Sequence, residues 1–351
     1  MIFDPILDLF RGKAITIPPL DGAFRPDTRL DEADLFCELR EVDNLVFFEE
    51  RVVGSSGNAI LELKAGAEPS LLEAFEAPVT ALAVLPDGGL AVALETGRLL
   101  IDGKPAELPA GIACITALAV DRSGTLWLAN GSAEHSPSDW ASDLMTHGAS
   151  GSVWKRAVGA TAFERVAGGL AFPYGLLPDG DGVVVSESWR HRLVRVTGSG
   201  GVEPVVEHIP GYPARIAPAS GGGAWLSVFA PRNRLIEFVL QEGRYRLDMM
   251  AEVPRAQWIA PAFSSGRSFL EPLQCGGIKT MGIHKPWAPS RSYGLLVRLD
   301  SAMQPVESYH SRANGSRHGI CSALEAGGRV LAASRGGDCV LAIPLNAPEG
   351  R

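Results

Sequence analysis

A short unit of two apolar strands joined by a tight turn recurs along this chain, and it constrains the fold more than any other feature. Clear copies occupy residues 79–101, 115–128 and 174–196, with Asp-Gly or Ser-Gly turns between their first two strands. Further copies occupy residues 215–228 and 320–334, and a weaker first copy occupies residues 43–63. Self-similarity at this period is typical of solenoids and propellers.

Six such units predict an all-β fold, a six-bladed β-propeller whose closed ring leaves short sheet edges and a central channel. The alternative all-β architecture, a two-layer sandwich, would show evenly spaced turns and no repeated group of strands. We expect one propeller domain over residues 37–347 and an N-terminal arm over residues 1–36 that packs outside it. Two long loop insertions, residues 129–151 and 241–292, are expected to act as lids or binding loops.

Charge and cysteine content limit the partners of the chain. Its formal net charge of −8 argues against nucleic acid or an anionic membrane surface as the main partner. Its 5 cysteines are scattered without a Cys-x-x-Cys pair, which supports neither a structural zinc site nor a redox motif. The first residues carry acids where a signal peptide needs basic residues, and no run reaches membrane-spanning length. We therefore expect a cytoplasmic protein without a membrane span.

Three motifs resemble those of the strictosidine synthase-like proteins, a branch of the gluconolactonase-type group of six-bladed propellers. Residues 147–154, HGASGSVW, are similar to the family's His-Gly-x-x-Gly-x-Leu segment. Residues 169–175, GLAFPYG, followed by ESWR at 187–190, are similar to Gly-Leu-x-Phe-Pro-Asn-Gly and Glu-Thr-Trp-Arg. Residues 210–216, PGYPARI, are similar to Pro-Gly-Tyr-Pro-Asp-Asn-Ile. The likeness runs in order over roughly residues 38–345 and implies a small-molecule site on the propeller axis.

The resemblance implies two chemistries, of which the first is calcium-dependent hydrolysis. In lactonase-like members a carboxylate, an Asn and an Asp hold a divalent ion on the axis, as hard cations require oxygen ligands. Here the first acid corresponds to Asp43, but the Asn is replaced by Tyr174 and the Asp by Ala214. We expect no metal site. Asp43 and Asn130 are the residual candidate ligands for Ca²⁺ or another divalent cation, in a ligand set that is degraded.

The second chemistry is the amine–aldehyde condensation of the plant synthase, which uses a Glu on the inner strand of the last blade. That position falls at or near Cys321, with His318 before it and Glu325 beyond the strand. The required acid is absent, so this is the least supported of the family functions.

Arg215, next to Ala214, brings a fixed positive charge toward the axis. It could replace the cation in polarising a carbonyl or could clamp a carboxylate; alternatively it forms a structural ion pair with Asp43 or Glu187. With Tyr174 it is our candidate for stabilising charge. Glu187 is either a general base, which needs burial to raise its pKa, or the partner of an arginine.

Other polar residues have competing interpretations. Asn130 is either a substrate contact or a turn cap. His318 and Cys321 could form a nucleophile pair, although a buried cysteine that packs as a small hydrophobe is commoner. His147, with His135, His284 and Trp287 on the insertions, could roof the pocket or lie on the surface. Trp189 and Trp225 are expected in the core.

We therefore expect a lactone or ester hydrolase acting in the central pocket on a small molecule that is anionic or bears a carbonyl. The alternative from another class is a non-catalytic small-molecule-binding propeller, which the loss of both catalytic signatures favours. Amine–aldehyde condensation is a third candidate.

Overall fold

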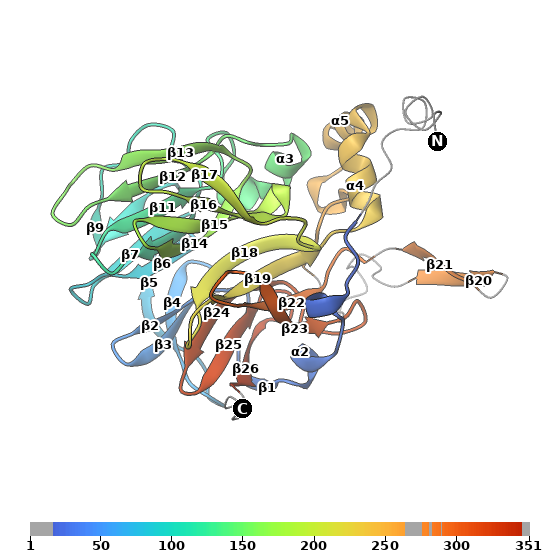
Figure 1. Cartoon of the computed structure of the whole chain (residues 1–351), viewed down its shortest axis with the longest axis horizontal. Helices are drawn as coiled ribbons and strands as arrows, with labels where there is room; N and C mark the ends of the chain where they lie inside the picture. Colours follow the sequence, from blue (N-terminus) through green and yellow to red (C-terminus); the bar gives the residue numbers. More distant parts are fainter. Residues whose placement is uncertain (1–16, 264–275, 281–282, 289, 346–351) are drawn as a thin grey trace.

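The computed structural model describes residues 17–263, 276–280, 283–288 and 290–345. Within them the chain forms six four-stranded antiparallel sheets arranged around one axis (Figure 1). The predicted six-bladed β-propeller is thus confirmed, with few helices.

Each repeat of the sequence is one blade. The strands of blades one to three are β2 (Val42–Phe48), β3 (Arg51–Ser56), β4 (Ala59–Leu63), β5 (Ser70–Ala74), β6 (Val79–Val84), β7 (Leu90–Leu94), β8 (Leu99–Ile101), β9 (Lys104–Pro105), β10 (Ile115–Val120), β11 (Leu126–Asn130), β12 (Gly151–Arg156) and β13 (Glu164–Leu170). Blade four has β14 (Pro173–Asp179), β15 (Gly182–Glu187), β16 (Arg192–Val196) and β17 (Val202–Val206), and blade five has β18 (Gly211–Pro218), β19 (Ala224–Pro231), β22 (Gly294–Leu299) and β23 (Pro305–Ser311). Blade six has β24 (Ile320–Ala326), β25 (Arg329–Ser334), β26 (Cys339–Pro344) and β1 (Asp34–Glu38).

The last blade is completed by the beginning of the chain. Strand β1 pairs antiparallel with β26 and so closes the ring between the two ends of the sequence. The boundary drawn at residues 36 and 37 falls inside this strand, so the final residues of the predicted arm are part of the propeller. Upstream, η1 (Gly22–Phe24) and α2 (Arg29–Glu32) lie against β23 of blade five. Arg29 anchors this segment, because its side chain bonds Asp27 and the Ser308 carbonyl and covers the Tyr309 ring at 4.0 Å.

The inner strands β2, β6, β10, β14, β18 and β24 contact one another in a closed ring around the axis. In every blade the pairing of the inner strand with the next one shifts register near the start of the inner strand. A bulge of this kind redirects side chains, and bulges are frequent near functional sites. The residues at the shifts include Thr80, Thr116, Tyr174, Arg215 and Cys321.

Small residues let these strands approach closely. A Cβ atom at Gly175 would lie 2.5 Å from the Ala214 carbonyl oxygen, so only glycine fits between β14 and β18. Behind the ring, apolar faces of neighbouring blades pack into separate clusters, such as Leu118, Leu126 and Leu128 of blade three against blade two. Alternation of apolar and small residues in the strands therefore builds both the blades and the contacts between them.

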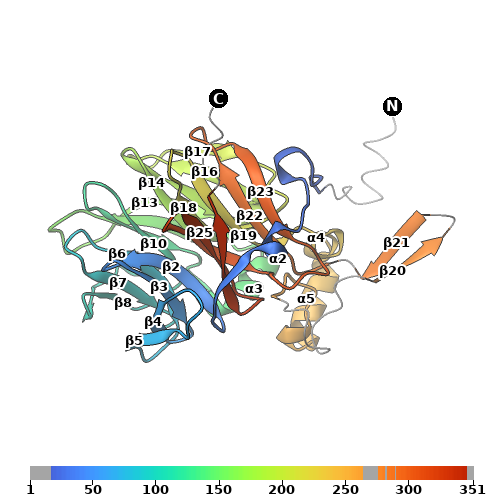
Figure 2. The same cartoon turned by 90° about the horizontal axis from the view of Figure 1, so that it is seen from below.

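The two insertions contain helices and lie at the same face of the propeller. The first, between β11 and β12, forms η2 (Pro137–Asp139) and α3 (Trp140–Met145). The second, between β19 and β22, forms α4 (Arg234–Gln241), α5 (Gly243–Glu252), η4 (Arg255–Gln257) and the hairpin β20 (Gly276–Thr280) and β21 (Ile283–Ala288). Other short turns include η3 (Ser188–Arg190) after β15. Figure 2 shows the hairpin projecting away from the blades beside α4 and α5.

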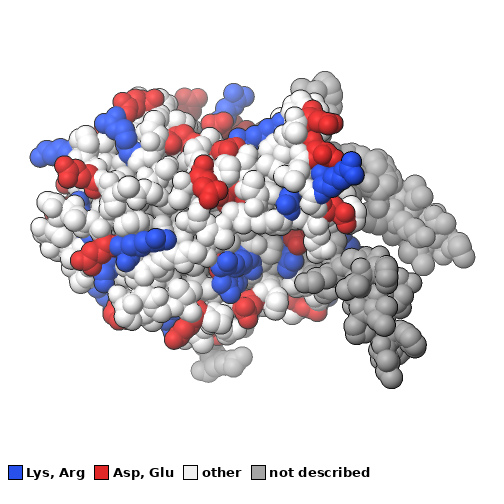
Figure 3. Space-filling view, turned by 90° about the horizontal axis from the view of Figure 1, so that it is seen from above, with Lys and Arg blue, Asp and Glu red and all other residues white. Residues whose placement is uncertain are grey.

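The surface and the helices bear on the predicted partners. On the face seen in Figure 3, acidic and basic side chains are interspersed among uncharged residues. In the described part of the chain, no helix has both the length and the apolar character needed to cross a bilayer.

Candidate functional site

A central pocket of about 440 Å³ opens among the starts of the inner strands. Strands of five blades supply part of its lining, including Asp43, Thr80, Thr116, Tyr174 and Arg215. The insertions cover it with other side chains, which are Pro137, Ser138, Trp140 and Phe263. The bulged residues of the inner strands and the two insertions therefore converge on one site, as predicted for an axial pocket.

Arg215 occupies the floor of this pocket and ties several blades together. Its Nη1 atom pairs with Asp43 Oδ1, and its Nη2 atom donates to the carbonyl oxygens of Thr80 (2.6 Å) and Thr116 (3.2 Å). Its guanidinium also lies 5.0 Å from the centre of the Tyr174 ring. Burial acts most strongly and lowers the pKa of Arg215, but the charge of Asp43 together with smaller contributions that include Tyr174 outweighs it, and the net pKa is raised. The permanent cation predicted at the axis is therefore present, with Asp43 as its partner.

Arg335 is a second cation in the pocket, and it was not among the residues predicted from the sequence. Its Nη1 atom lies 3.4 Å from Asp43 Oδ2, so one carboxylate is shared by two guanidinium groups. Burial acts most strongly and lowers the pKa of Arg335, but the charge of Asp43 together with smaller contributions that include Glu41 outweighs it, and the net pKa is raised. The side chain of Arg335 is 36% exposed, compared with 12% for Arg215. Arg335 is thus the more accessible of the two cations.

Arg335 could have been predicted from the sequence by comparing the ends of the second strands of the blades. The predicted candidates Asn130 and Glu187 end the second strands of blades three and four. Arg335 and Glu95 come one residue after the corresponding strands β25 and β7, and both line the pocket. Successive strand residues point to opposite faces, so a shift of one position decides which side chain reaches the axis.

Glu187 lies outside the lining of the pocket and is fully buried. It pairs with Arg190 and with Arg192 (Nε to Oε2, 2.6 Å) and accepts from the Ala171 backbone N–H at 2.7 Å. This network is the arginine-paired alternative that the sequence left open. We therefore leave Glu187 out of the catalytic set.

Asn130 also serves the local backbone. Its Oδ1 atom accepts from the N–H groups of Ala113 (3.0 Å) and Cys114 (2.9 Å), and its Nδ2 atom donates to the Gly111 carbonyl at 3.1 Å. The side chain is fully buried and lies outside the pocket lining. These contacts support the turn-capping interpretation over the substrate contact and leave no carboxamide oxygen facing the pocket as a ligand.

Neither of the candidates His318 and Cys321 lines the pocket. His318 contacts Ser292 Oγ at 3.0 Å and the Arg312 carbonyl at 2.7 Å. Cys321 donates to the Val42 carbonyl at 3.4 Å, and its burial, with the nearby charge of Asp43, raises its pKa well above the usual range. The thiol therefore stays protonated, which disfavours a nucleophile pair.

The insertion residues differ from one another. His147 Nε2 contacts the Leu240 carbonyl at 3.0 Å, so it joins the two insertions and does not line the pocket. His135 contacts Asp139 at 2.9 Å and does not line the pocket. The side chains of His284 and Trp287 lie outside the described part of the structure. Trp225 is in the core, as expected, whereas Trp189 lines the pocket.

Aromatic rings form the wall of the pocket on the side of blades four and five. The wall is made of Trp140, Phe172, Tyr174, Trp189, Phe229 and Phe263. Phe172 stacks on Trp189 with ring centres 4.4 Å apart, and the indole N–H of Trp189 donates to the buried Asp143 at 2.6 Å. Burial, followed by the charge of Asp43, raises the pKa of Tyr174 to about 12. The phenol thus remains neutral and contributes chiefly an apolar ring.

The donor set at the floor does not fit a family-type calcium ion. Both oxygens of Asp43 face guanidinium groups, and Arg215 already occupies the carbonyls of Thr80 and Thr116. Ala214 offers no side-chain oxygen, and the described residues include no group of three or more His, Cys, Asp or Glu placed to hold a metal ion. Calcium needs several oxygen ligands, and a fixed cation among them opposes its binding.

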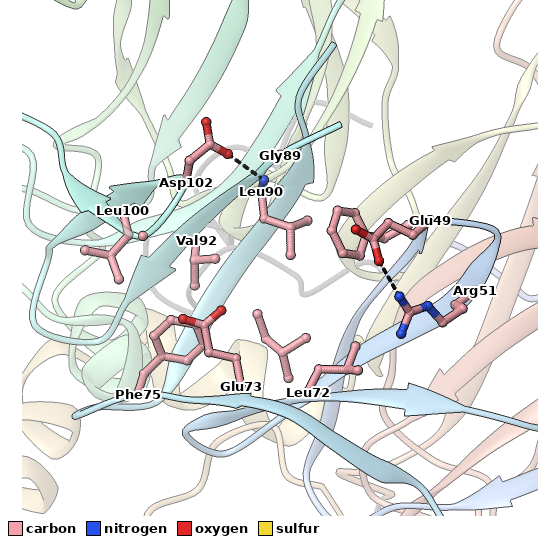
Figure 4. Close-up of a pocket in the computed structure, with 13 residues that line it drawn as sticks. Glu49, Arg51, Leu72, Glu73, Phe75, Gly89, Leu90, Val92, Leu100 and Asp102 are labelled. Carbon is pink, nitrogen blue, oxygen red and sulfur yellow. Dashed lines mark hydrogen bonds and ion pairs between the residues drawn. The ribbon is translucent and has the colours of Figure 1, made fainter. Parts of the chain in front are cut away.

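A second hollow of about 320 Å³ lies between blades one and two (Figure 4). Apolar side chains such as Phe48, Leu72 and Phe75 line much of it. Two of the three acids that line it have local partners, since Glu49 pairs with Arg51 and Asp102 accepts from the Leu90 N–H at 3.1 Å. It does not bring together residues from around the axis, and we take the central pocket as the functional site.

Comparisons with known proteins agree with this architecture. No family model matches the chain. A segment is 39% identical over 69 residues to adipocyte plasma membrane-associated protein of Danio rerio, which is strictosidine synthase-like, and covers 18% of this chain and 17% of that protein. The mouse (Mus musculus) protein is 42% identical over 64 residues, covering 16% of this chain and 15% of its own length.

Solved structures match over far more of the chain. A putative gluconolactonase superposes with a TM-score of 0.56 at 13% identity, covering 90% of this chain and 92% of that one. A gluconolactonase from Xanthomonas campestris gives 0.56 at 16% identity, covering 94% and 99%. Likeness at these identities shows the fold alone. The chain is a six-bladed propeller that resembles gluconolactonase structures and shares partial homology with a strictosidine synthase-like protein.

Proposed function

We propose that the chain is a small-molecule hydrolase of the lactone or ester type that works in the central pocket without the family's divalent cation. The observation that supports this proposal is the floor of the pocket, where Asp43 lies between the guanidinium groups of Arg215 and Arg335. A carboxylate can accept a proton from water, and fixed cations can stabilise the oxyanion of a tetrahedral intermediate.

We infer different tasks for the two arginines from their contacts. The Nη atoms of Arg215 are engaged by Asp43, Thr80 and Thr116, so this residue orients Asp43 and supplies fixed charge. Arg335 is the more exposed donor, and it is better placed to meet the carbonyl oxygen of a substrate. The direct role predicted for Arg215 and Tyr174 therefore passes largely to Arg335.

The proposed reaction is an ordinary ester hydrolysis. Water adds to the carbonyl carbon while Asp43 takes one of its protons, and the negative charge forms on the carbonyl oxygen beside Arg335. The bond between the carbonyl carbon and the alkoxy oxygen then breaks, and the departing oxygen receives the proton from Asp43. Atoms and charge balance without a further reactant.

A panel of lactones and esters, assayed with added calcium and with a chelator, tests this proposal. We expect turnover that is equal in both conditions and falls by about a hundredfold or more in Asp43→Asn. Arg335→Gln should lower kcat/KM by about tenfold or more. Arg195→Gln, on the far side of blade four from the pocket, is the matched control for loss of one positive charge. Turnover that requires calcium would contradict the proposal.

A non-catalytic binding protein is the second candidate, and the same floor gives a reason for it. Each oxygen of the Asp43 carboxylate is already engaged by a guanidinium group, which is an arrangement suited to holding charge in place without catalysis. No turnover on the whole panel, together with retained binding of a ligand in the pocket, would favour this alternative. Condensation of an amine with an aldehyde gains no support, because Glu325 bonds Ser220 and Trp225 outside the pocket lining.

A further inference from the structure

The floor of the central pocket has more positive than negative charge. Asp43 is the carboxylate between Arg215 and Arg335, and Arg215 is additionally satisfied by two backbone carbonyls. Within the described residues, the Arg335 guanidinium has one polar contact, to Asp43 Oδ2 at 3.4 Å, which is longer than the contact between Arg215 and Asp43. Most of its donors are thus available to the pocket. The Arg335 side chain is 36% exposed, and a guanidinium with donors to spare can form charge-assisted hydrogen bonds to an anion that enters the pocket.

Thr80 supplies a second donor at the floor, next to Arg215, whose Nη2 atom bonds the Thr80 carbonyl at 2.6 Å. The residue is only 9% exposed and lines the pocket, and its Oγ1 atom has no hydrogen-bond partner in the described structure. A buried hydroxyl usually finds a partner. The guanidinium fork of Arg335 has parallel donors suited to the two oxygens of a carboxylate, and the Thr80 hydroxyl is a further donor in the same pocket.

The acids at the rim limit the charge of the ligand. Glu41 and Glu95 both line the pocket, and Glu95 Oε1 is held by the Ser138 N–H at 2.9 Å. Their negative charge would repel a ligand that carries a second anionic group toward the opening. The arrangement therefore favours a single carboxylate directed to the floor.

The aromatic wall, whose Phe263 ring lies 5.5 Å from the Arg335 guanidinium, indicates the rest of the ligand. It consists of the six aromatic rings named above, which present apolar faces and few polar atoms. A flat apolar body can pack against such rings in stacked or edge-on geometry. A polyhydroxylated body would lose its water contacts there without regaining hydrogen bonds. A pocket of about 440 Å³ is of ordinary size for a small ligand.

We propose that the central pocket binds a monocarboxylate with a flat apolar body, and that Arg335 is its anion-binding residue, assisted by Thr80. If the chain is a hydrolase, such an anion is the acid released from an ester or lactone. If it is a binding protein, the anion is the bound ligand. The proposal therefore stands or fails separately from the hydrolysis proposed above.

Isothermal titration calorimetry of the full chain with 2-naphthoate and 2-naphthamide tests the proposal, since the two differ in charge but hardly in shape. We expect 2-naphthoate to bind at least about tenfold more tightly, because an ionic hydrogen bond replaces a neutral one. Gluconate, a carboxylate without the apolar body, should bind much more weakly than 2-naphthoate. Equal affinity for acid and amide, or no binding of 2-naphthoate at millimolar concentration, would overturn it.

Variants locate the anion within the pocket. Arg335→Gln should weaken the binding of 2-naphthoate by about tenfold or more and leave the affinity for 2-naphthamide unchanged. Arg335→Lys should recover part of the loss, and Arg195→Gln should match the unaltered chain. If Arg335→Gln does not fold by circular dichroism, Thr80→Val gives the second test, with an expected loss of about threefold or more. Unchanged affinity in the folded variants would exclude Arg335 as the anion site.

Discussion

The two halves of the central pocket are built on the same scaffold and yet differ in what holds them together. In the polar half, Arg215 of blade five bonds Asp43, Thr80 and Thr116 of blades one to three, and Arg335 of blade six shares the carboxylate of Asp43. On the side of blades four and five, aromatic rings pack on one another and on the insertions. Residues of both halves lie at the bulged starts of the inner strands. The scaffold therefore fixes their position, and the type of side chain fixes their chemistry.

The difference predicts different responses to mutation. The polar half depends on a few charged side chains. Removing one of them leaves its partner's charge buried without a counter-ion. The aromatic half depends on contact area, and truncation there removes packing while the remaining groups stay neutral. Substitutions in each half should therefore be distinguishable in stability and in binding.

Arg215→Ala should have the largest effect. It leaves Asp43 with the looser contact to Arg335 and deprives two carbonyls of their donor, so we expect a loss of about 3–5 kcal/mol in the free energy of unfolding. Ligand binding should also be lost. Urea denaturation measures the change, with Arg215→Lys as the control that keeps the charge without the planar fork. Unfolding within about 1 kcal/mol of the original would refute the central role of this ion pair.

Phe229→Ala probes the aromatic half. Phe229 is 3% exposed and contacts several rings of the wall, so we expect a loss of about 3 kcal/mol in stability. Phe238, on α4, is 49% exposed and gives the matched control, with an expected change within about 0.5 kcal/mol. Calcium-independent turnover, if present, should fall mainly through KM. Equal losses for the two substitutions would contradict the packing role of the wall.

Low pH should destabilise the contacts of Glu237 with His191 and Arg232, which lie next to the aromatic half. Burial acts to raise the pKa of Glu237, but His191 and Arg232 outweigh it and lower the pKa to about 2, from a usual value of 4.5. This depressed pKa contributes stability that is present above pH 4.5 and is lost as the pH falls toward 2. We expect a loss of about 2 kcal/mol over that window, measured by denaturation at each pH. Glu237→Gln should flatten the profile; an unchanged slope in that variant would assign the acid sensitivity to other groups.

Thr80→Val should have the smallest effect on stability. The hydroxyl has no partner in the described structure, so its removal should change the free energy of unfolding by less than about 0.5 kcal/mol, or raise it. Thr116 gives the contrast, because its Oγ1 atom donates to the Pro173 carbonyl at 2.5 Å and Thr116→Val should cost about 1 kcal/mol. If Thr80→Val costs as much as Thr116→Val, the Thr80 hydroxyl has a structural partner and not a ligand-binding role.

The repeat alone predicted the propeller because, apart from the strand β1 that completes blade six, each blade is built from strands that follow in order along the sequence. A strand, a turn and the next strand specify their own pairing, as glycines with positive φ at Gly124 (φ 84°) and Gly180 (φ 62°) show. The inner strands can be located in the same way, and their positions in the repeat place Arg215 and Tyr174 near the axis. The pairing of Arg215 with Asp43 was one of two alternatives that the sequence left open.

Only the tertiary structure decided which residues share the pocket. Asp43 and Arg335 are 292 positions apart, and their meeting depends on closure of the ring by β1. A one-residue difference in register separates Glu187, buried between arginines, from the side chains that reach the axis. Local patterns determine the strands because hydrogen bonding and turn geometry act between neighbours. The site depends on contacts between distant blades, and no local pattern encodes those contacts.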